Sequence, residues 1–361
     1  MSSVEDHALL EKPTGAEAPT SESQLTAPTT CRCLVRLKTY FQNDRVAVMW
    51  LTHLQIRHLP YHLKTLYLFS KSDIKTVLVP QTILLLAAIL GPEPLTTTST
   101  PDDTTHALRQ VPLAVVWMWL NLIVCGVSNQ RLPDSVLEDE HNKPWRPIAA
   151  GRLTTAQAHT LLLVAIPVVM VASAVLGGFT PTVTMMALLW MYNDLDGSGA
   201  NVWSRNAINT GGIMCFSAGA LEVASGGGEL PARAWWWIAL TGAAVMTTVQ
   251  ALDFPDMEGD RARGRQTIPL VCGEEVARGG LAVAVVIWSI ACPLFWDVRP
   301  VGWAAPVGVG FAMAALTVLR REVKFDGVVA KLWCLWMCAL YVLPLLARLG
   351  EEMVVEGSSA L

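Results

Sequence analysis

RAWWWIALTGAAVMTTVQALDFPDMEGDRARGRQTIP, residues 233–269, decides the fold class of this chain. The first twenty residues, 233–252, carry a single charge at Arg233, and about 20 mostly apolar residues suffice for a helix to cross a bilayer core. The following seventeen, 253–269, hold four acidic and three basic residues. The stretch therefore predicts a membrane-crossing helix that opens directly into a charged loop.

The same kind of apolar segment recurs along most of the chain. Of its 361 residues, 52% are hydrophobic and 16% charged, whereas soluble domains carry about 25% charged residues. We expect an all-α, polytopic membrane protein with about nine transmembrane helices. The expected spans are 74–91, 111–128, 156–177, 180–195, 206–225, 233–252, 279–296, 301–319 and 329–348. The net charge of −4 gives no indication of nucleic-acid binding.

The segments outside the spans divide the rest of the chain. Residues 1–52 form a polar cytosolic tail whose acidic, Pro-, Thr- and Ser-rich start predicts disorder and lacks the pattern of a signal peptide. Residues 53–73 mix basic and aromatic side chains with leucines, which predicts an amphipathic helix at the membrane interface, in contact with lipids. Residues 74–350 are expected to form the transmembrane domain, and 351–361 a short C-terminal tail.

The distribution of lysine and arginine predicts the orientation of the spans. Counted from a cytosolic N-terminus, the inner loops hold thirteen of these residues, against four in the outer loops and C-terminus. Since positive residues favour the cytosolic side, we place the N-terminus in the cytosol. The charged loops after the second and sixth spans then share the cytosolic face.

The loop after the sixth span has the composition of a metal and phosphate site. Asp253, Asp256 and Asp260 are spaced i, i+3 and i+7, so on a helix they would stack on one face. A hard divalent cation removes the repulsion between such carboxylates, and Mg²⁺ binds through carboxylates together with phosphate oxygens. Guanidinium groups match phosphate geometry, and three of them follow at once: Arg261, Arg263 and Arg265. A solvated, charged cap on the helix is the alternative interpretation.

The loop after the second span repeats this composition. Lys143 and Arg146 are candidate phosphate partners, and the candidate oxygen ligands are Asn129, Asp134, Glu138, Asp139 and Asn142. Tyr192, Asn193 and Asp194 end the fourth span on the same side. These three are candidates for closing the site or for handling the proton of a carbocation, with a helix-end cap as the alternative.

Three short motifs in these loops resemble those of the UbiA superfamily of intramembrane prenyltransferases. NKPWRPIAAG at 142–151 resembles the NxPxRPxxxG that follows the first aspartate motif of that family. DMEGD at 256–260 resembles the second motif, DxxxD, and GRQTIP at 264–269 is similar to the GRxTxP that trails it. The resemblance covers about residues 70–350 and implies a nine-span bundle around a central cavity capped by the two motif loops.

The first motif departs from the family pattern NDxxDxxxD. Asn129 is followed by Gln130, and Asp139 lies ten residues after Asn129 instead of eight, so Asp134 or Glu138 is a candidate replacement ligand. With FSKSD at 69–73 and the Gln250–Asp253 pair, this variant looks like a fungal branch of the superfamily. Members of that branch include membrane-bound terpene cyclases of secondary metabolism.

Together the loops and the resemblance lead to a specific functional hypothesis. Mg²⁺, held by Asn129 and Asp139 on one loop and by Asp256 and Asp260 on the other, would ionise a C15 or C20 isoprenyl diphosphate. Asp139, Asp256 and Asp260 are the expected catalytic carboxylates, and the expected diphosphate-binding residues are Asn142, Lys143, Arg146, Arg261 and Arg265.

The fate of the resulting cation separates the candidate functions. The altered first motif favours terpene cyclisation, and transfer of the prenyl group to an aromatic or other acceptor is the alternative. A transporter or lipid-binding protein is the non-enzymatic alternative. Ion paths are marked by acidic residues within the spans, whereas here the acidic residues lie mostly in arginine-rich loops, which argues against this alternative. We expect the protein in the endoplasmic reticulum membrane, with the mouth of the site facing the cytosol.

Overall fold

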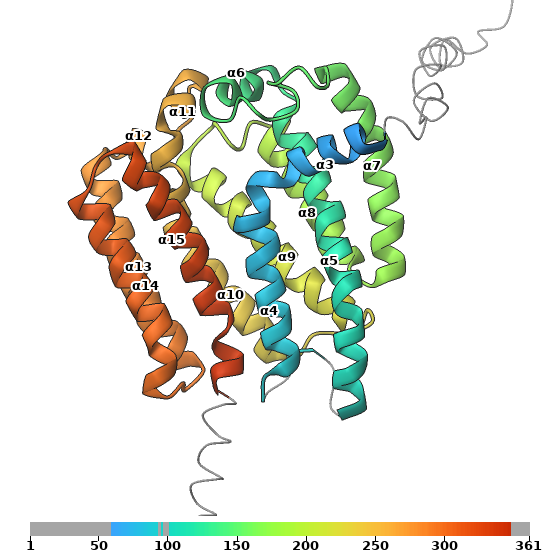
Figure 1. Cartoon of the computed structure of the whole chain (residues 1–361), viewed down its shortest axis with the longest axis vertical. Coiled ribbons are helices and arrows are strands. Elements are labelled where there is room, and N and C mark those ends of the chain that lie inside the picture. The colour runs from blue at the N-terminus through green and yellow to red at the C-terminus, as the bar shows by residue number, and fades with distance from the viewer. Residues whose placement is uncertain (1–58, 93–94, 97–100, 348–361) are drawn as a thin grey trace, which may run out of the picture. The chain divides into compact units, whose positions relative to one another are not determined.

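The computed structural model describes residues 59–92, 95–96 and 101–347, and these residues form a bundle of helices without β-strands (Figure 1). The terminal tails predicted at 1–52 and 351–361 lie outside the described residues. The long helices are α3 (Leu59–Asp73), α4 (Val79–Leu90), α5 (Pro101–Gln130), α7 (Thr155–Leu176), α8 (Phe179–Asn193), α9 (Val202–Ala224), α10 (Ala232–Thr248), α13 (Glu274–Phe295), α14 (Pro300–Leu319) and α15 (Val323–Tyr341). Shorter elements are η2 (Ile74–Leu78), α6 (Pro133–Asn142), η3 (Val249–Leu252), η4 (Phe254–Asp256), α11 (Met257–Arg263) and α12 (Ile268–Val271).

Each of the nine expected spans falls on a helix, but nine is only an approximate count. Seven helical stretches of the described chain are long and apolar enough to cross a membrane, with α3 to α4 counted as one stretch and α10 to α11 as another. The two remaining helices fall short for different reasons. Helix α8 has 15 residues, and α15 carries Lys324, Asp326 and Lys331 in its first half.

The outer face of the bundle is apolar, as contact with lipid requires. On α7, Val164, Val168, Val171 and Val175 lie on one face, and their side chains are between 48% and 81% exposed. In water a stripe of this kind would favour association, whereas lipid chains solvate it. The structure therefore describes an integral membrane protein.

Two buried tryptophans of the interior donate hydrogen bonds between helices. The indole nitrogen of Trp117 donates to Ser173 Oγ at 2.9 Å, and that of Trp333 donates to Thr248 Oγ1 at 3.0 Å. Both indoles are buried at the centre of the main hydrophobic cluster, between helices distant in sequence. Because unsatisfied donors are costly in an apolar medium, these bonds fix how the helices pack.

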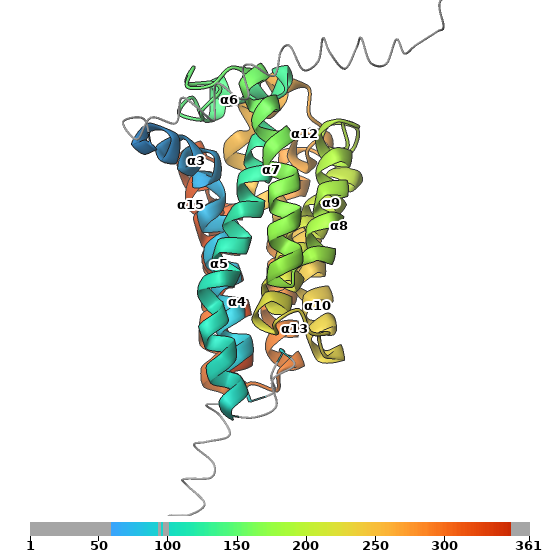
Figure 2. The ribbon, with the colours of Figure 1, turned by 90° about the vertical axis from the view of Figure 1, so that its right-hand side faces the viewer.

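The first span is bent where its backbone changes register. Residues 74–78 form the π-helical turn η2, and Pro80 follows in the first turn of α4. Proline lacks an N–H group and its ring crowds the preceding turn, so the helix is distorted in the turn before Pro80. Helix α3 consequently stands at an angle to α4 and lies across one end of the bundle (Figure 2).

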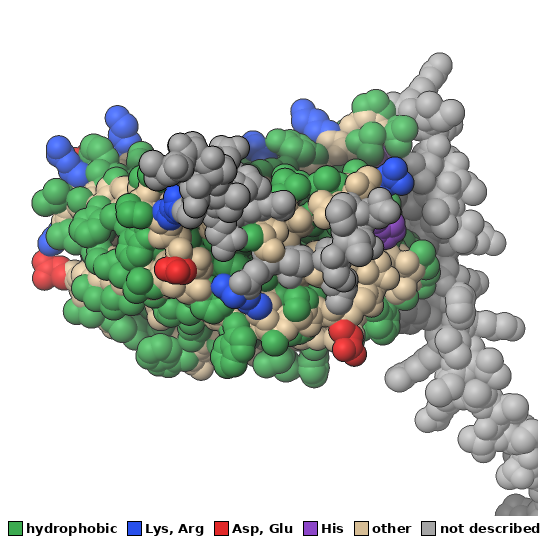
Figure 3. Space-filling model, turned by 90° about the horizontal axis from the view of Figure 1, so that it is seen from below, with side chains coloured by type: hydrophobic (Ala, Val, Ile, Leu, Met, Phe, Trp, Pro, Cys, Tyr) green, Lys and Arg blue, Asp and Glu red, His purple; other side chains and the backbone are tan. Residues whose placement is uncertain are grey.

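The two motif loops of the sequence fold as short helices at that same end. Helices α6 and α11 contact each other there, and α12 follows close by (Figure 1). The opposite end presents mainly hydrophobic side chains, with few and scattered charged ones, over the area not covered by grey atoms (Figure 3). The charged chemistry of the bundle therefore gathers at one end.

Candidate active site

The two motif loops are joined by the side chain of Asn142 at the end of α6. Its amide nitrogen donates to the backbone oxygen of Asp256 at 3.0 Å, and its amide oxygen accepts from the backbone N–H of Gly259 at 3.2 Å. A Cβ atom at position 259 would lie 2.3 Å from the Asn142 nitrogen, so only glycine permits this approach. Beside this contact, Lys143 forms an ion pair with Asp256.

A buried ion network strengthens the same junction. Glu138 of α6 pairs with Arg263 at 3.0 Å and with Arg265 at 2.9 Å, and Arg265 also pairs with Asp260 at 3.3 Å. Burial by itself would raise the pKa of Glu138, but the two arginines together lower it below its usual value. Glu138 is therefore a carboxylate held ionised by arginines of the other loop, which differs from the role of a free metal ligand predicted for it.

Asp139, the predicted end of the first motif, is buried beside Arg146. The guanidinium donates to its carboxylate at 2.6 Å. Burial raises the pKa of Asp139 to about 6 despite the nearby positive charge of Arg146. The two predicted groups, metal ligand and phosphate partner, thus lie in direct contact.

The three aspartates of the second loop do not stack on one helical face. Residues 249–256 form two 3₁₀ turns with Pro255 in the second, and an α-helix begins only at Met257. Each carboxylate instead meets a different cation: Asp253 pairs with Arg205, Asp256 with Lys143 and Asp260 with Arg265. The helical spacing expected from the sequence is therefore wrong in its geometry, because proline and 3₁₀ turns redirect the side chains.

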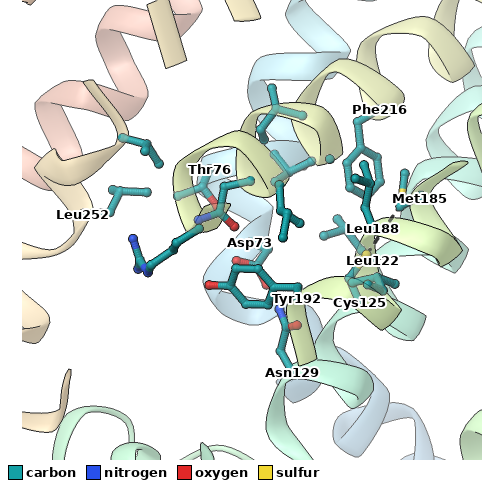
Figure 4. Close-up of a pocket in the computed structure, with 18 of the residues that line it drawn as sticks. Asp73, Thr76, Leu122, Cys125, Asn129, Met185, Leu188, Tyr192, Phe216 and Leu252 are labelled. Carbon is teal, nitrogen blue, oxygen red and sulfur yellow. Dashed lines mark hydrogen bonds between the residues drawn. The ribbon is translucent and has the colours of Figure 1, made fainter. Parts of the chain in front are cut away.

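A partly open chamber of about 210 Å³ lies within the bundle near these loops. Its polar lining residues are Asp73, Thr76, Asn129, Tyr192, Arg205, Asn209 and Asp253. Its apolar lining includes Leu122, Met185, Leu188, Ile213, Phe216 and Trp333. In Figure 4 the labelled polar side chains group together, and Leu122, Leu188, Met185 and Phe216 lie toward another part of the wall. The chamber is thus amphipathic, as a site for a lipid with a charged head group must be.

Several predicted residues line this chamber or support it. Asn129 and Tyr192 belong to its wall, and Asn193 donates to Asn129 Oδ1 at 2.9 Å and to Ser128 Oγ at 3.1 Å. Asp194 is exposed and pairs with Arg131, which ties the end of α8 to the end of α5. Asn193 and Asp194 therefore hold helix ends in place, and Tyr192 faces the chamber.

Other predicted residues lie apart from the chamber lining. Asp134 is exposed in the first turn of α6 and Arg261 is exposed on α11. Gln130, which stands in place of an aspartate of the family motif, is 1% exposed and donates to the backbone oxygen of Phe69 at 3.1 Å. None of these three residues is among the described residues that line the chamber.

Two charged lining residues, Asp73 and Arg205, were not among the sequence-predicted site residues. Arg205 pairs with Asp253 at 2.8 Å at the start of α9, and Asp73 ends α3 at the bend of the first span. Their signal in the sequence was the high cost of charged groups in membrane helices, which makes such residues functional candidates. Each of them directly borders a predicted apolar span: the sequence placed Asp73 at the end of the interfacial helix 53–73 and Arg205 in a loop.

The donor atoms at the chamber mouth fit Mg²⁺ only in company with a phosphate ligand. Within the described part of the chain, no three His, Cys, Asp or Glu side chains lie close enough to hold a metal ion by themselves. Oxygen donors are nonetheless present at Asn129 and Asp253, and Asp260 Oδ2 is buried without a hydrogen-bond partner among the described residues. Because Mg²⁺ takes oxygen ligands and commonly shares them with phosphates, this donor set suits it.

The fold and the site define a polytopic membrane protein with an apolar chamber beneath a charged mouth. The model of the UbiA prenyltransferase family matches residues 85–335, and the chain therefore belongs to this family. It is an enzyme of the UbiA type, which acts on prenyl diphosphates.

Similar proteins include two terpene synthases and an archaeal membrane protein. The chain is 29% identical over 291 residues to the fumagillin β-trans-bergamotene synthase of Aspergillus fumigatus, covering 81% of this chain and 95% of the relative. It is 31% identical over 276 residues to the somaliensene A/B synthase of Streptomyces somaliensis, covering 72% and 85%. The apo structure of a UbiA homologue from Aeropyrum pernix superposes with a TM-score of 0.53 at 17% identity, covering 78% and 98%, which shows a shared fold.

Disruption of the buried junction between the loops should reveal energetic coupling across it. We predict that the effects of Glu138→Gln and Arg263→Gln on the free energy of unfolding are non-additive, with a coupling energy of about 0.5–3 kcal/mol. Either substitution alone already breaks the ion pair between the two residues, so the second one costs less. The measurement is a double-mutant cycle on the free energy of unfolding in detergent. As a control, Arg263→Gln combined with Glu275→Gln, an exposed residue of α13, should be additive. Additivity of the first pair would show that the loops are not joined in this way.

Proposed function

We propose that this enzyme ionises an isoprenyl diphosphate of C15 or C20 length within the membrane and cyclises the cation to a terpene hydrocarbon. The observation that carries the proposal is the amphipathic chamber, whose apolar wall leads to a mouth crowded with lysine and arginine side chains. The names of two similar proteins, both terpene synthases, support cyclisation over transfer.

The charged residues of the mouth are suited to receive a diphosphate. Lys143, Arg146, Arg205 and Arg265 are each paired with a carboxylate, so they are held in place before the substrate arrives. In our proposal these cations turn toward phosphate oxygens and stabilise the charge that develops on the leaving group. Arg261, which is exposed on α11, would act at the outer edge of the mouth.

The carboxylates released from those pairs are the proposed metal ligands. Asn129 and Asp139 on one loop, and Asp256 and Asp260 on the other, would hold Mg²⁺, with Asp253 on the chamber wall as a further ligand. Mg²⁺ would supply Lewis-acid activation of the diphosphate as a leaving group. Glu138 is held by two arginines and Asp134 lies in solvent, so both are weaker candidates than in the sequence-based hypothesis.

The apolar wall would control what happens to the cation. Leu122, Leu188 and Phe216 exclude water from the carbon chain. A double bond of the same chain can then attack the cation before water captures it. Trp333 and Tyr192 place aromatic groups on the wall, where π faces can stabilise a migrating positive charge. Transfer to an aromatic or other acceptor is the alternative function of the same site, and it would require room for a second substrate.

We further propose that the protein lies in the endoplasmic reticulum membrane with its mouth facing the cytosol. The support is the excess of lysine and arginine in the loops at the mouth, which follows the rule for cytosolic loops. The amphipathic character of residues 53–73 would place α3 at the lipid interface on the same side. Exposed Leu59, Leu63 and Tyr67 on α3 are consistent with contact to lipid.

Purified protein in detergent or nanodiscs should convert one of two substrates without any acceptor. Incubated with farnesyl or geranylgeranyl diphosphate and Mg²⁺, it is expected to release pyrophosphate and a hydrocarbon detectable by gas chromatography and mass spectrometry. Removal of Mg²⁺ with EDTA should stop both. Product formation only after addition of an acceptor would identify a transferase instead, and no turnover of either diphosphate would contradict the proposal.

Substitution of the mouth carboxylates should separate catalytic from surface acids. Asp256→Asn and Asp139→Asn are expected to lower turnover about 100-fold or more. Each substitution removes a carboxylate that is proposed to hold the Mg²⁺ that activates the diphosphate as a leaving group. Glu258→Gln and Glu140→Gln are matched controls, since both acids lie exposed on the same two loops, and should turn over substrate at close to the wild-type rate. If the two aspartate variants also remain active, the assignment of the site is wrong.

A further inference from the structure

Asp73 differs from every other acidic residue around the chamber in lacking a cationic partner. Two carboxylates line the chamber, and the other one, Asp253, pairs with Arg205. Among the residues that the structure describes, no Lys, Arg or His side chain lies within ion-pair distance of Asp73. A carboxylate without an ion pair is costly within a membrane bundle, so its presence points to a role in the chemistry.

The nearest cations are committed elsewhere. Lys71 stacks on the Trp145 ring at 4.2 Å, Lys143 pairs with Asp256, and Arg146 pairs with Asp139. Lys75, two residues after Asp73, is exposed and acts on Asp73 through space without forming an ion pair. Asp73 therefore has no lysine, arginine or histidine side chain in direct contact among the described residues.

A purely structural role for Asp73 finds no support in the local backbone. The residue occupies the position that precedes the π-helical turn at 74–78, where a carboxylate often caps the backbone. Its side chain makes no capping hydrogen bond there. The bend of the first span instead places this side chain on the chamber wall, together with Thr76 and across from the apolar residues (Figure 4).

We propose that Asp73 is the base that accepts the proton with which cyclisation ends. This inference rests on the cyclase function proposed above. The other proton acceptors on the chamber wall are weaker or engaged: Tyr192 and Cys125 are neutral groups, and Asp253 pairs with Arg205 and is a proposed metal ligand once Arg205 binds the diphosphate. Asp73 has the Thr76 hydroxyl as a hydrogen-bond partner but no ion pair, and such a carboxylate is the strongest base that the chamber wall offers to a carbocation.

The step balances without any further reactant. The C–H bond next to the cationic carbon breaks, and its electron pair forms a carbon–carbon double bond. The proton moves to a carboxylate oxygen of Asp73, which becomes a carboxylic acid. Because ionisation has already released pyrophosphate, the overall products are one hydrocarbon, pyrophosphate and one proton, which Asp73 returns to pyrophosphate or water as the products leave.

The test compares ionisation with product identity in Asp73→Asn. We expect pyrophosphate release within about threefold of wild type, while the share of the main hydrocarbon falls at least about tenfold in favour of alcohols or isomeric olefins. Asp73→Glu, which retains the carboxylate, should still give hydrocarbon as the main product class. Asp253→Asn is the contrasting variant, since it is expected to lose pyrophosphate release itself.

Three results would overturn the proposal. An unchanged hydrocarbon profile in Asp73→Asn would show that pyrophosphate or another group takes the proton. Loss of pyrophosphate release together with a raised Mg²⁺ requirement would assign Asp73 to metal binding. Alcohols as the main products of Asp73→Glu would show that its carboxylate does not carry out the step. Failure of the wild type to form any hydrocarbon would instead disprove the cyclase function on which the proposal depends.

Discussion

Everything in this structure depends on one junction, where two charged loops at the same end of the bundle neutralise each other. Asn142 joins them through two hydrogen bonds to the backbone, and Glu138 joins them through ion pairs to Arg263 and Arg265. Charged groups at the end of a membrane bundle are tolerated only when they are paired or hydrated. The pairing therefore fixes the loops over the chamber, and it also holds lysine and arginine side chains ready for an anionic ligand.

The same arrangement explains how one site can both bind and release a charged head group. Lys143, Arg146, Arg205 and Arg265 each pair with a carboxylate in the structure. When a diphosphate binds with Mg²⁺, these cations would pair with phosphate oxygens and the carboxylates with the metal, so no charge is left unpaired. Below the mouth the wall becomes apolar, and the charged groups where the two regions meet are the Arg205–Asp253 pair and Asp73. This division would place bond cleavage at the polar end and carbon chemistry at the apolar end of one chamber.

The sequence predicted the helical class and the two loops because both leave strong local signals. A span needs only a sufficient length of apolar residues, and the motifs around Asn142 and Asp256 lie within a few residues of one another along the chain. Most predicted loop residues do meet in space, since the spans that carry them end on the same side. The expected stacking of Asp253, Asp256 and Asp260 failed because Pro255 and the 3₁₀ turns replace the continuous helix that it assumed.

What the sequence did not reveal depends on packing between distant segments. Asp73 reaches the chamber only because α3 bends away from α4, and Arg205 reaches it only because α9 packs beside the loop that carries Asp253. Similarly, α6 could not be recognised as a helix from a sequence dominated by charged residues, and the span count was affected by the short α8 and by the charges of α15. These features are set by tertiary contacts that no local pattern records.

The most direct test of the account is a cross-link between cysteines introduced as Asn142→Cys and Gly259→Cys in membranes. A Cβ atom at position 259 would lie 2.5 Å from Asn142 Cγ, so a sulfur atom at position 142 would lie within bonding reach of a cysteine at 259. The account predicts that mild oxidation yields a disulfide between these positions, identified as a linked peptide by mass spectrometry. If both cysteines react freely with maleimide but no linked peptide forms, the two loops do not meet over a common chamber.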